Sequence, residues 1–142
     1  MFPFKFGVTE FTPIFLLLTI PPYIASLIFA LKYVHARKME FYSFFLLTFF
    51  LNVLIFFTKD MITLLVVYEM VSLFSFPLIL QERIKESFKA AKLYFFFSLL
   101  SGVLVFGGLI LLTNPELKLI AASLMGMGFL IKAGGYPFHV WL

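Results

Sequence analysis

Cysteine is absent from the 142-residue chain, and charged residues make up only 13% of it. The lack of cysteine excludes disulfides, thiolate zinc sites, iron–sulfur clusters and cysteine nucleophiles. The sequence also has no Walker loop, no dinucleotide-binding glycine fingerprint, no metal-ligand cluster and no Ser/His/Asp triad in polar surroundings. We therefore expect no cofactor and no active site in this chain, and we place any redox chemistry in another polypeptide.

The shortage of charge is matched by an excess of apolar residues. Hydrophobic residues make up 63% of the chain, and 22 residues are phenylalanine. A water-soluble fold cannot enclose so much apolar surface, so we expect the protein to lie in lipid. The net charge of +4 is typical of the basic loops of a membrane protein, and we expect no nucleic-acid partner.

Five apolar runs are separated by short charged segments. An α-helix needs about 20 residues to cross the hydrocarbon core of a bilayer. We predict an all-α integral membrane protein that forms a single module over residues 1–142. Its transmembrane helices are expected at about 11–31, 41–57, 61–80, 93–112 and 119–142.

The basic residues predict how the chain is oriented in the membrane. The connections after the first and third predicted spans lie on one side and hold seven of the eleven basic residues. These seven are Lys32, Arg37, Lys38, Arg83, Lys85, Lys89 and Lys92. By the positive-inside rule, this side faces the cytoplasm or matrix and the N-terminus is external.

Glu69 lies near the middle of the third predicted span. A bare carboxylate at that depth costs several kcal/mol, so it needs a partner, water or a proton. Ionisable residues inside a membrane are functional by default, and we predict that Glu69 takes part in ion translocation. The alternative is a neutral Glu69 whose hydrogen bonds serve helix association.

Lys132 is the second candidate, because it lies in the fifth apolar run just before a helix-breaking sequence. Gly134, Gly135 and Pro137 follow it and predict that the last helix is broken near Gly134–Pro137. A lysine beside unwound backbone gains carbonyl partners and room for water, as in transporters. The alternative is a lysine whose ammonium group reaches the interface along its stem.

The two candidates lie on spans that enter the membrane from the same side. Glu69 is eight residues beyond Met61 and Lys132 is thirteen beyond Leu119, which gives depths of about 12 and 20 Å at 1.5 Å per residue. If the two helices are neighbours, the pair forms a usable proton relay, because burial favours a neutral lysine and a nearby carboxylate favours a charged one.

Further candidates are supporting residues. His139 can pass protons near neutral pH, but it is equally compatible with a packing role. Lys92 is a candidate relay or support residue. Asn52 predicts a hydrogen bond between helices, because it is a polar group in an apolar span. Small residues one turn apart predict close helix packing. These pairs are Ser98 with Gly102 and Ala122 with Gly126.

Three segments of the chain resemble a known family. They are Tyr68–Ile79 (YEMVSLFSFPLI), Lys89–Tyr94 (KAAKLY) and Ile131–Leu142 (IKAGGYPFHVWL). In order and separation they look like the antiporter-like membrane subunits shared by respiratory complex I (NADH-quinone oxidoreductase), Mrp cation/proton antiporters and membrane-bound hydrogenases. The last segment is the most specific, and the resemblance spans nearly the whole chain, from Val8 to Leu142.

The resemblance implies roles for the two charged residues and a limit for the chain. It makes Glu69 and Lys132 the central pair of a proton half-channel, with Lys132 on a broken helix. It also aligns the five spans with the third to seventh helices of a longer family pattern. The implied protein is a split or truncated subunit, completed by another chain in a larger complex.

The leading functional prediction is translocation of protons or sodium, coupled to redox chemistry in partner subunits. The chain would be a non-redox membrane subunit of a hydrogenase-like or complex I-like assembly in the cell (inner) membrane. Its expected partners are other membrane subunits, including a chain that supplies the missing helices, the lipid bilayer, and protons or sodium. The alternatives are a structural or assembly subunit without an ion pathway, part of an Mrp-type antiporter, and the mitochondrial inner membrane.

Overall fold

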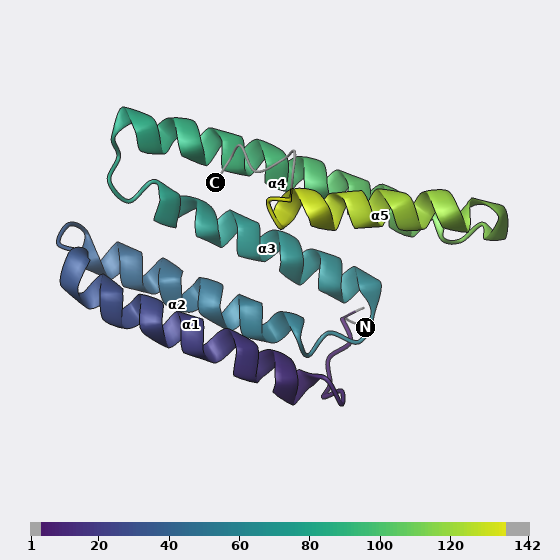
Figure 1. Cartoon of the computed structure of the whole chain (residues 1–142), viewed down its shortest axis with the longest axis horizontal. Helices are drawn as coiled ribbons and strands as arrows, with labels where there is room; N and C mark the ends of the chain where they lie inside the picture. The colour runs from purple at the N-terminus through teal and green to yellow at the C-terminus, as the bar shows by residue number, and fades with distance from the viewer. Residues whose placement is uncertain (1–3, 136–142) are drawn as a thin grey trace. The chain divides into compact units, whose positions relative to one another are not determined.

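The described part of the chain, residues 4–135, consists of helices joined by short connections in a computed structural model. The elements are α1 (Thr12–Tyr33), α2 (Lys38–Ile55), α3 (Met61–Ile79), α4 (Lys85–Leu111), the 3-10 helix η1 (Pro115–Leu117) and α5 (Lys118–Lys132) (Figure 1). Within residues 4–135, extended pairing is limited to an isolated bridge between Phe6 and Thr58. The predicted all-α class is therefore confirmed.

Four of the five predicted spans are helices of membrane length. The helices α1 to α4 are each long and apolar enough to cross a bilayer. In the described residues α5 has 15 residues, which is about 22 Å at 1.5 Å per residue. The rest of the predicted fifth span lies outside the described residues. The protein is therefore a multi-helical membrane protein.

The helix α4 begins earlier than the sequence predicted. It starts at Lys85, whereas the predicted span started at residue 93. The intervening residues are rich in Lys, Glu and Ala, which are good helix formers although they are not apolar. Lys89 and Lys92 therefore lie on a helix, and their expected place between two membrane spans stays a prediction.

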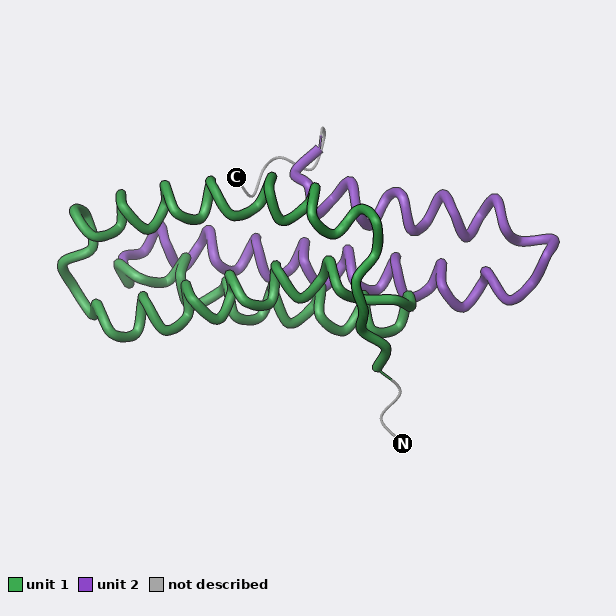
Figure 2. Tube along the Cα trace, turned by 90° about the horizontal axis from the view of Figure 1, so that it is seen from below, with its two compact units in different colours: residues 1–83 green, residues 84–142 purple. Residues whose placement is uncertain are grey.

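The chain divides into two compact units, residues 1–83 and residues 84–142 (Figure 2). Unit 1 contains α1, α2 and α3, and unit 2 contains α4, η1 and α5. The single module expected over the whole chain stays a prediction.

Aromatic rings join α1 to α2 within unit 1. Phe15 stacks on Phe56 with ring centroids 5.2 Å apart, and Tyr23 meets Phe49 at 4.9 Å. The Asn52 amide donates a hydrogen bond to the Tyr23 hydroxyl at 2.8 Å, which confirms the predicted bond between helices. A polar bond inside an apolar contact fixes which turns of the two helices face each other.

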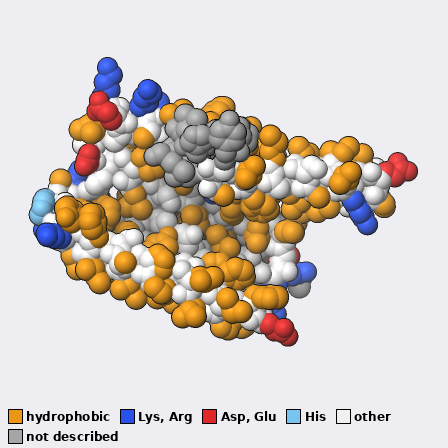
Figure 3. Space-filling model, in the orientation of Figure 1, with side chains coloured by type: hydrophobic (Ala, Val, Ile, Leu, Met, Phe, Trp, Pro, Cys, Tyr) orange, Lys and Arg blue, Asp and Glu red, His pale blue; other side chains and the backbone are white. Residues whose placement is uncertain are grey.

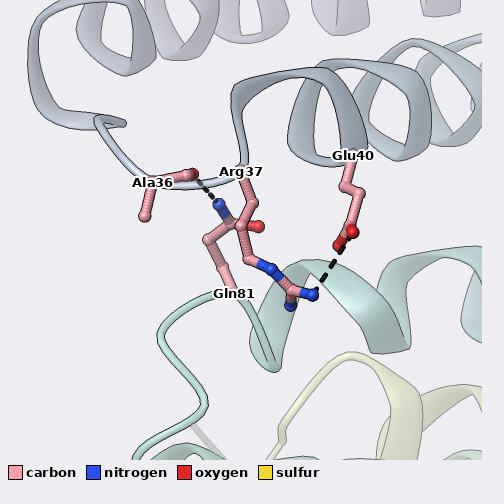
Figure 4. A network of polar contacts seen from close by, with 4 residues as sticks. All are labelled: Ala36, Arg37, Glu40 and Gln81. Atoms are coloured by element: carbon pink, nitrogen blue, oxygen red, sulfur yellow. Dashed lines mark hydrogen bonds and ion pairs between the residues drawn. The ribbon is translucent and has the colours of Figure 1, made fainter.

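Both ends of unit 1 carry polar ties. At one end, the Lys59 N–H donates to the Lys5 carbonyl at 2.9 Å, and the Lys5 N–H donates to the Thr63 hydroxyl at 3.0 Å. At the other end, the Gln81 amide donates to the Ala36 carbonyl (Figure 4). The connections after α1 and α3 therefore lie at the same end of unit 1, as the predicted topology requires.

Small residues bring α4 and α5 together in unit 2. Ser98 and Gly102 are buried, as predicted, but Ala122 and Gly126 are exposed. The packed face of α5 consists of Ala121, Met125, Gly128 and Ile131 instead. A Cβ on Gly128 would lie 2.8 Å from the Ser101 carbonyl oxygen, so the two backbones approach closely there.

Hydrophobic side chains cover the flanks of the helices, and the charged side chains visible in Figure 3 lie near helix ends. In unit 1 the exposed apolar residues include Leu17 at 73% and Leu18 at 65% exposure. Exposed apolar flanks are what a helix needs in lipid, where no water has to be excluded.

Candidate functional site

Glu69 stands at the middle of α3. It is eight residues beyond Met61 in a helix of 19 residues. The side chain is half-buried, and its Oε1 atom is fully buried. Ser72 follows three residues later, so it shares the Glu69 side of the helix. Ser72 is buried as well, and its hydroxyl donates to the Tyr68 carbonyl at 3.4 Å. A carboxyl group therefore sits at mid-helix depth beside a polar hydroxyl.

The start of α3 is fixed by Asp60. Its carboxylate accepts hydrogen bonds from the Thr63 backbone N–H at 2.9 Å and from the Thr63 hydroxyl at 2.6 Å. These two bonds, the hydroxyl first, hold the pKa of Asp60 below its usual value of 3.8. The cap satisfies a free N–H at the helix start and so sets the register that places Glu69.

Lys132 is the last residue of α5, where a glycine stops the helix. The Gly135 N–H donates to the Leu130 carbonyl at 3.0 Å, and the Gly134 N–H donates to the Ile131 carbonyl at 3.1 Å. Gly134 has a φ of 66°, a left-handed conformation that glycine adopts at little cost. This pair of bonds is the Schellman motif. The helix therefore ends where the sequence predicted an interruption, and Pro137 lies outside the described residues.

The position of Lys132 has an electrostatic consequence. A helix C-terminus carries a partial negative charge from its last carbonyl groups, and this charge favours a nearby cation. Lys132 itself is half-buried. The end of α5 therefore places Lys132 where the helix dipole attracts a positive charge.

Ser101 of α4 supports the same turn, and the sequence argument missed it. Its hydroxyl donates to the Gly128 carbonyl at 2.8 Å, and Ser101 is 0% exposed. Gly128 is four residues before Lys132, so its carbonyl is also the helical acceptor for the Lys132 N–H. Ser101 thus anchors the last turn of α5 to α4. The sequence feature that could have pointed to Ser101 is its position three residues after Ser98 in an apolar run.

The structure does not show the other predicted site residues beside Lys132. Lys92 is exposed on α4, and His139 lies outside the described residues. Glu69 belongs to unit 1 and Lys132 to unit 2, so their pairing stays a prediction. Among residues 4–135, no group of three His, Asp or Glu side chains is placed to hold a metal ion.

A separate cavity of about 770 Å³ lies in unit 1 between α1 and α2. We call it the α1–α2 cavity. Its walls include four aromatic rings, from Phe29 and Tyr33 on α1 and from Phe41 and Phe45 on α2. Its polar lining includes Ser26 on α1 and three residues in the connections. These residues are His35, Gln81 and Glu82.

Comparison with known proteins gives no match, whether to family models, to curated proteins or to solved structures. What supports a function for this chain is therefore the chemistry of its own residues.

Proposed function

We propose that this chain carries half of an ion pathway through a membrane, with Glu69 and Lys132 as the side chains that handle the ion. The observation that carries the proposal is the buried Oε1 of Glu69 in the middle of a membrane-length helix. A carboxyl group in lipid is costly unless it exchanges its charge with a proton or a cation. The resemblance of the Glu69 and Lys132 segments to antiporter-like subunits supports the same role.

Each residue has a distinct part in this pathway. Glu69 takes up and releases a proton, or binds sodium. Among the described residues, it is the one acidic side chain at this depth in a helix. Lys132 interacts with the charge of the transported ion. It does so from the end of α5, where the helix terminus and the hydrogen bond from Ser101 hold its backbone in place. A lysine at an interrupted helix is the arrangement used where unwound backbone lines an ion route.

The proposal places the chain in a multi-subunit assembly. As a non-redox subunit, it would work beside membrane subunits that supply the remaining helices and beside partners that carry out the redox chemistry. A hydrogenase-like or complex I-like complex of the cell (inner) membrane is the preferred setting. An Mrp-type antiporter and the mitochondrial inner membrane are the alternatives.

The test is ion flux in vesicles. The tagged chain is purified with the subunits that accompany it and is reconstituted with a pH-sensitive dye inside the vesicles. Under an imposed sodium or proton gradient, we expect Glu69→Gln to lower the flux about 100-fold, because an amide cannot take up a proton. Lys132→Ala should lower it comparably. Uptake of radioactive sodium distinguishes the two ions.

The matched controls change the same charges at exposed positions. Glu10→Gln lies before α1, and Lys118→Ala lies at the start of α5. Both should leave the flux and the subunit composition unchanged. Full flux through Glu69→Gln would contradict the proposal. Loss of subunits from the purified assembly, with no specific loss of flux, would favour the structural role instead.

A further inference from the structure

The apolar walls of the α1–α2 cavity include two pairs of stacked rings. Phe29 and Tyr33 are one turn apart on α1, with ring centroids 4.0 Å apart. Phe41 and Phe45 form a similar pair on α2, at 5.8 Å. Phe29 and Tyr33 are 62% and 57% exposed, so these rings are open to a ligand. Small-molecule sites of about 300 to 1,000 Å³ with apolar and aromatic walls are the common kind.

Small side chains on α1 make room between these rings. They are Ala25, Ser26 and Ala30. From Ala25 to Tyr33 the lining of α1 extends for two turns, about 12 Å at 1.5 Å per residue. Just before Ala25, Tyr23 meets Phe45 edge-on at 5.6 Å, so α1 and α2 are in contact there. The apolar part of the cavity therefore runs along the two helices, as a site for an acyl chain would.

The lining from the two connections provides hydrogen-bond acceptors. The Gln81 amide nitrogen donates to the Ala36 carbonyl (Figure 4), and the amide oxygen of the same side chain is an acceptor. An ionised Glu82 has acceptors only, and a neutral His35 has one donor and one acceptor nitrogen. A head group that donates a hydrogen bond, such as a hydroxyl, therefore suits this end of the cavity.

The charges at the α1–α2 cavity disfavour a charged head group of either sign. Among the described residues, the lining has no Lys or Arg and its one formally charged residue is Glu82, which repels an anion. Lys32 lines a neighbouring pocket, and its Nζ atom is 5.8 Å from the centre of the Tyr33 ring, where it repels a cation. Arg37 is paired with Glu40 at 3.3 Å. An uncharged head group avoids both repulsions.

We infer that the α1–α2 cavity binds an uncharged lipid with a hydroxyl head group, of the diacylglycerol kind. One acyl chain lies along Phe29 and Phe45, and the hydroxyl lies beside Gln81 and Glu82. The aromatic walls match the chain, and the acceptors from the connections match the head group. The inference does not depend on the ion pathway.

Native mass spectrometry of the purified assembly in detergent tests the inference. Three lipids with two oleoyl chains each are added at equal concentration. They are the uncharged diacylglycerol, the anionic phosphatidic acid and the cationic trimethylammonium propane. The cavity-bound lipid is the part that Ala25→Trp removes, because this variant places a large ring in the lining. We expect diacylglycerol to be the main cavity-bound lipid, and Ala122→Trp, at an exposed position on α5, should not displace it.

A second variant tests the charge of the lining. Glu82→Gln keeps an acceptor but removes the negative charge, so it should raise the cavity-bound phosphatidic acid about fivefold, the effect of one charge near a head group. Diacylglycerol should stay bound. Glu10→Gln, before the start of α1, should change neither lipid.

Three results would overturn the inference. One is cavity-bound lipid that is mainly phosphatidic acid or mainly the cationic lipid. Another is equal loss of diacylglycerol from Ala25→Trp and Ala122→Trp. The third is an equal effect of Glu82→Gln and Glu10→Gln on phosphatidic acid. Circular dichroism checks that the helix content of each variant is unchanged.

Discussion

At the scale of single residues, Asp60 makes the start of α3 sensitive to acid. Thr63 lowers the pKa of this carboxyl group below 3.8 in the folded chain. The ionised cap therefore stabilises the folded state at pH values above 3.8. Its contribution declines as the pH falls through 3.8 and is lost below the folded pKa. We expect Asp60→Asn to lower the thermal unfolding temperature in detergent at about pH 7, and this difference should shrink towards about pH 2.

The control for Asp60 is a carboxylate that does not cap a helix. Glu10→Gln removes one negative charge before α1 and corrects for the change in net charge. A difference between Asp60→Asn and the unmodified protein that grows on acidification would contradict the capping role. Unfolding curves recorded by circular dichroism over the same pH range measure both the capping effect and the effect of net charge.

A charged residue in an apolar run stands out as a functional candidate in a sequence, whereas the role of a serine or threonine there does not. The position of Glu69 at mid-helix followed from the apolar residues around it, and the helix end at Lys132 followed from Gly134. Ser101 could not be singled out, because a serine in a membrane helix can satisfy itself with a carbonyl of the preceding turn. Only the structure shows that its hydroxyl reaches Gly128 on another helix.

At the scale of the elements, the contact between α4 and α5 depends on two glycines. We expect Gly128→Ala to destabilise unit 2 by about 2 kcal/mol, because the added methyl group would be driven against the Ser101 carbonyl oxygen. Gly108→Ala should act similarly, since its Cβ would lie 2.7 Å from the Ala121 carbonyl oxygen. Thermal unfolding in detergent, followed by circular dichroism, measures both changes.

Neighbouring glycines provide matched controls for this contact. Gly126 and Gly107 have open space where a Cβ would stand. Gly126→Ala and Gly107→Ala should therefore stabilise their helices by about 0.5 to 1 kcal/mol, the usual gain from alanine in a helix. If all four variants shift the unfolding temperature in the same direction, the close approach at Gly128 is not what holds the pair together.

The sequence identifies helices better than it identifies the faces by which they pack. Apolar length located all five helices, but it missed the first residues of α4, where Lys and Ala continue the helix outside the apolar run. The predicted face of α5 was wrong because adjacent residues point about 100° apart on a helix. Ala121 and Ala122 are equally small, and only the position of Gly128 against α4 decides between them.

At the scale of the whole molecule, the absence of cysteine allows the orientation to be tested cleanly. Glu10→Cys and His35→Cys each introduce a single thiol, at opposite ends of α1. By the positive-inside rule, we expect a membrane-impermeant maleimide to label Glu10→Cys in intact cells. His35→Cys should be labelled only after the membrane is opened.

Either of two labelling results would contradict this orientation. One is labelling of His35→Cys in intact cells, and the other is protection of Glu10→Cys until the membrane is opened. The unmodified chain serves as the blank, because it has no thiol to react. Labelling is measured as the mass added to the purified chain.

The hydrogen bonds between residues 5–7 and the region around the start of α3 limit the order in which unit 1 can fold. The Gly7 N–H donates to the Phe57 carbonyl at 2.7 Å, and Lys5 bonds to Thr63, 58 residues further along the chain. These contacts cannot form until α2 and the beginning of α3 have left the ribosome. Residues 5–7 therefore take their place in unit 1 only after the residues they contact, as far as Thr63, have been synthesised.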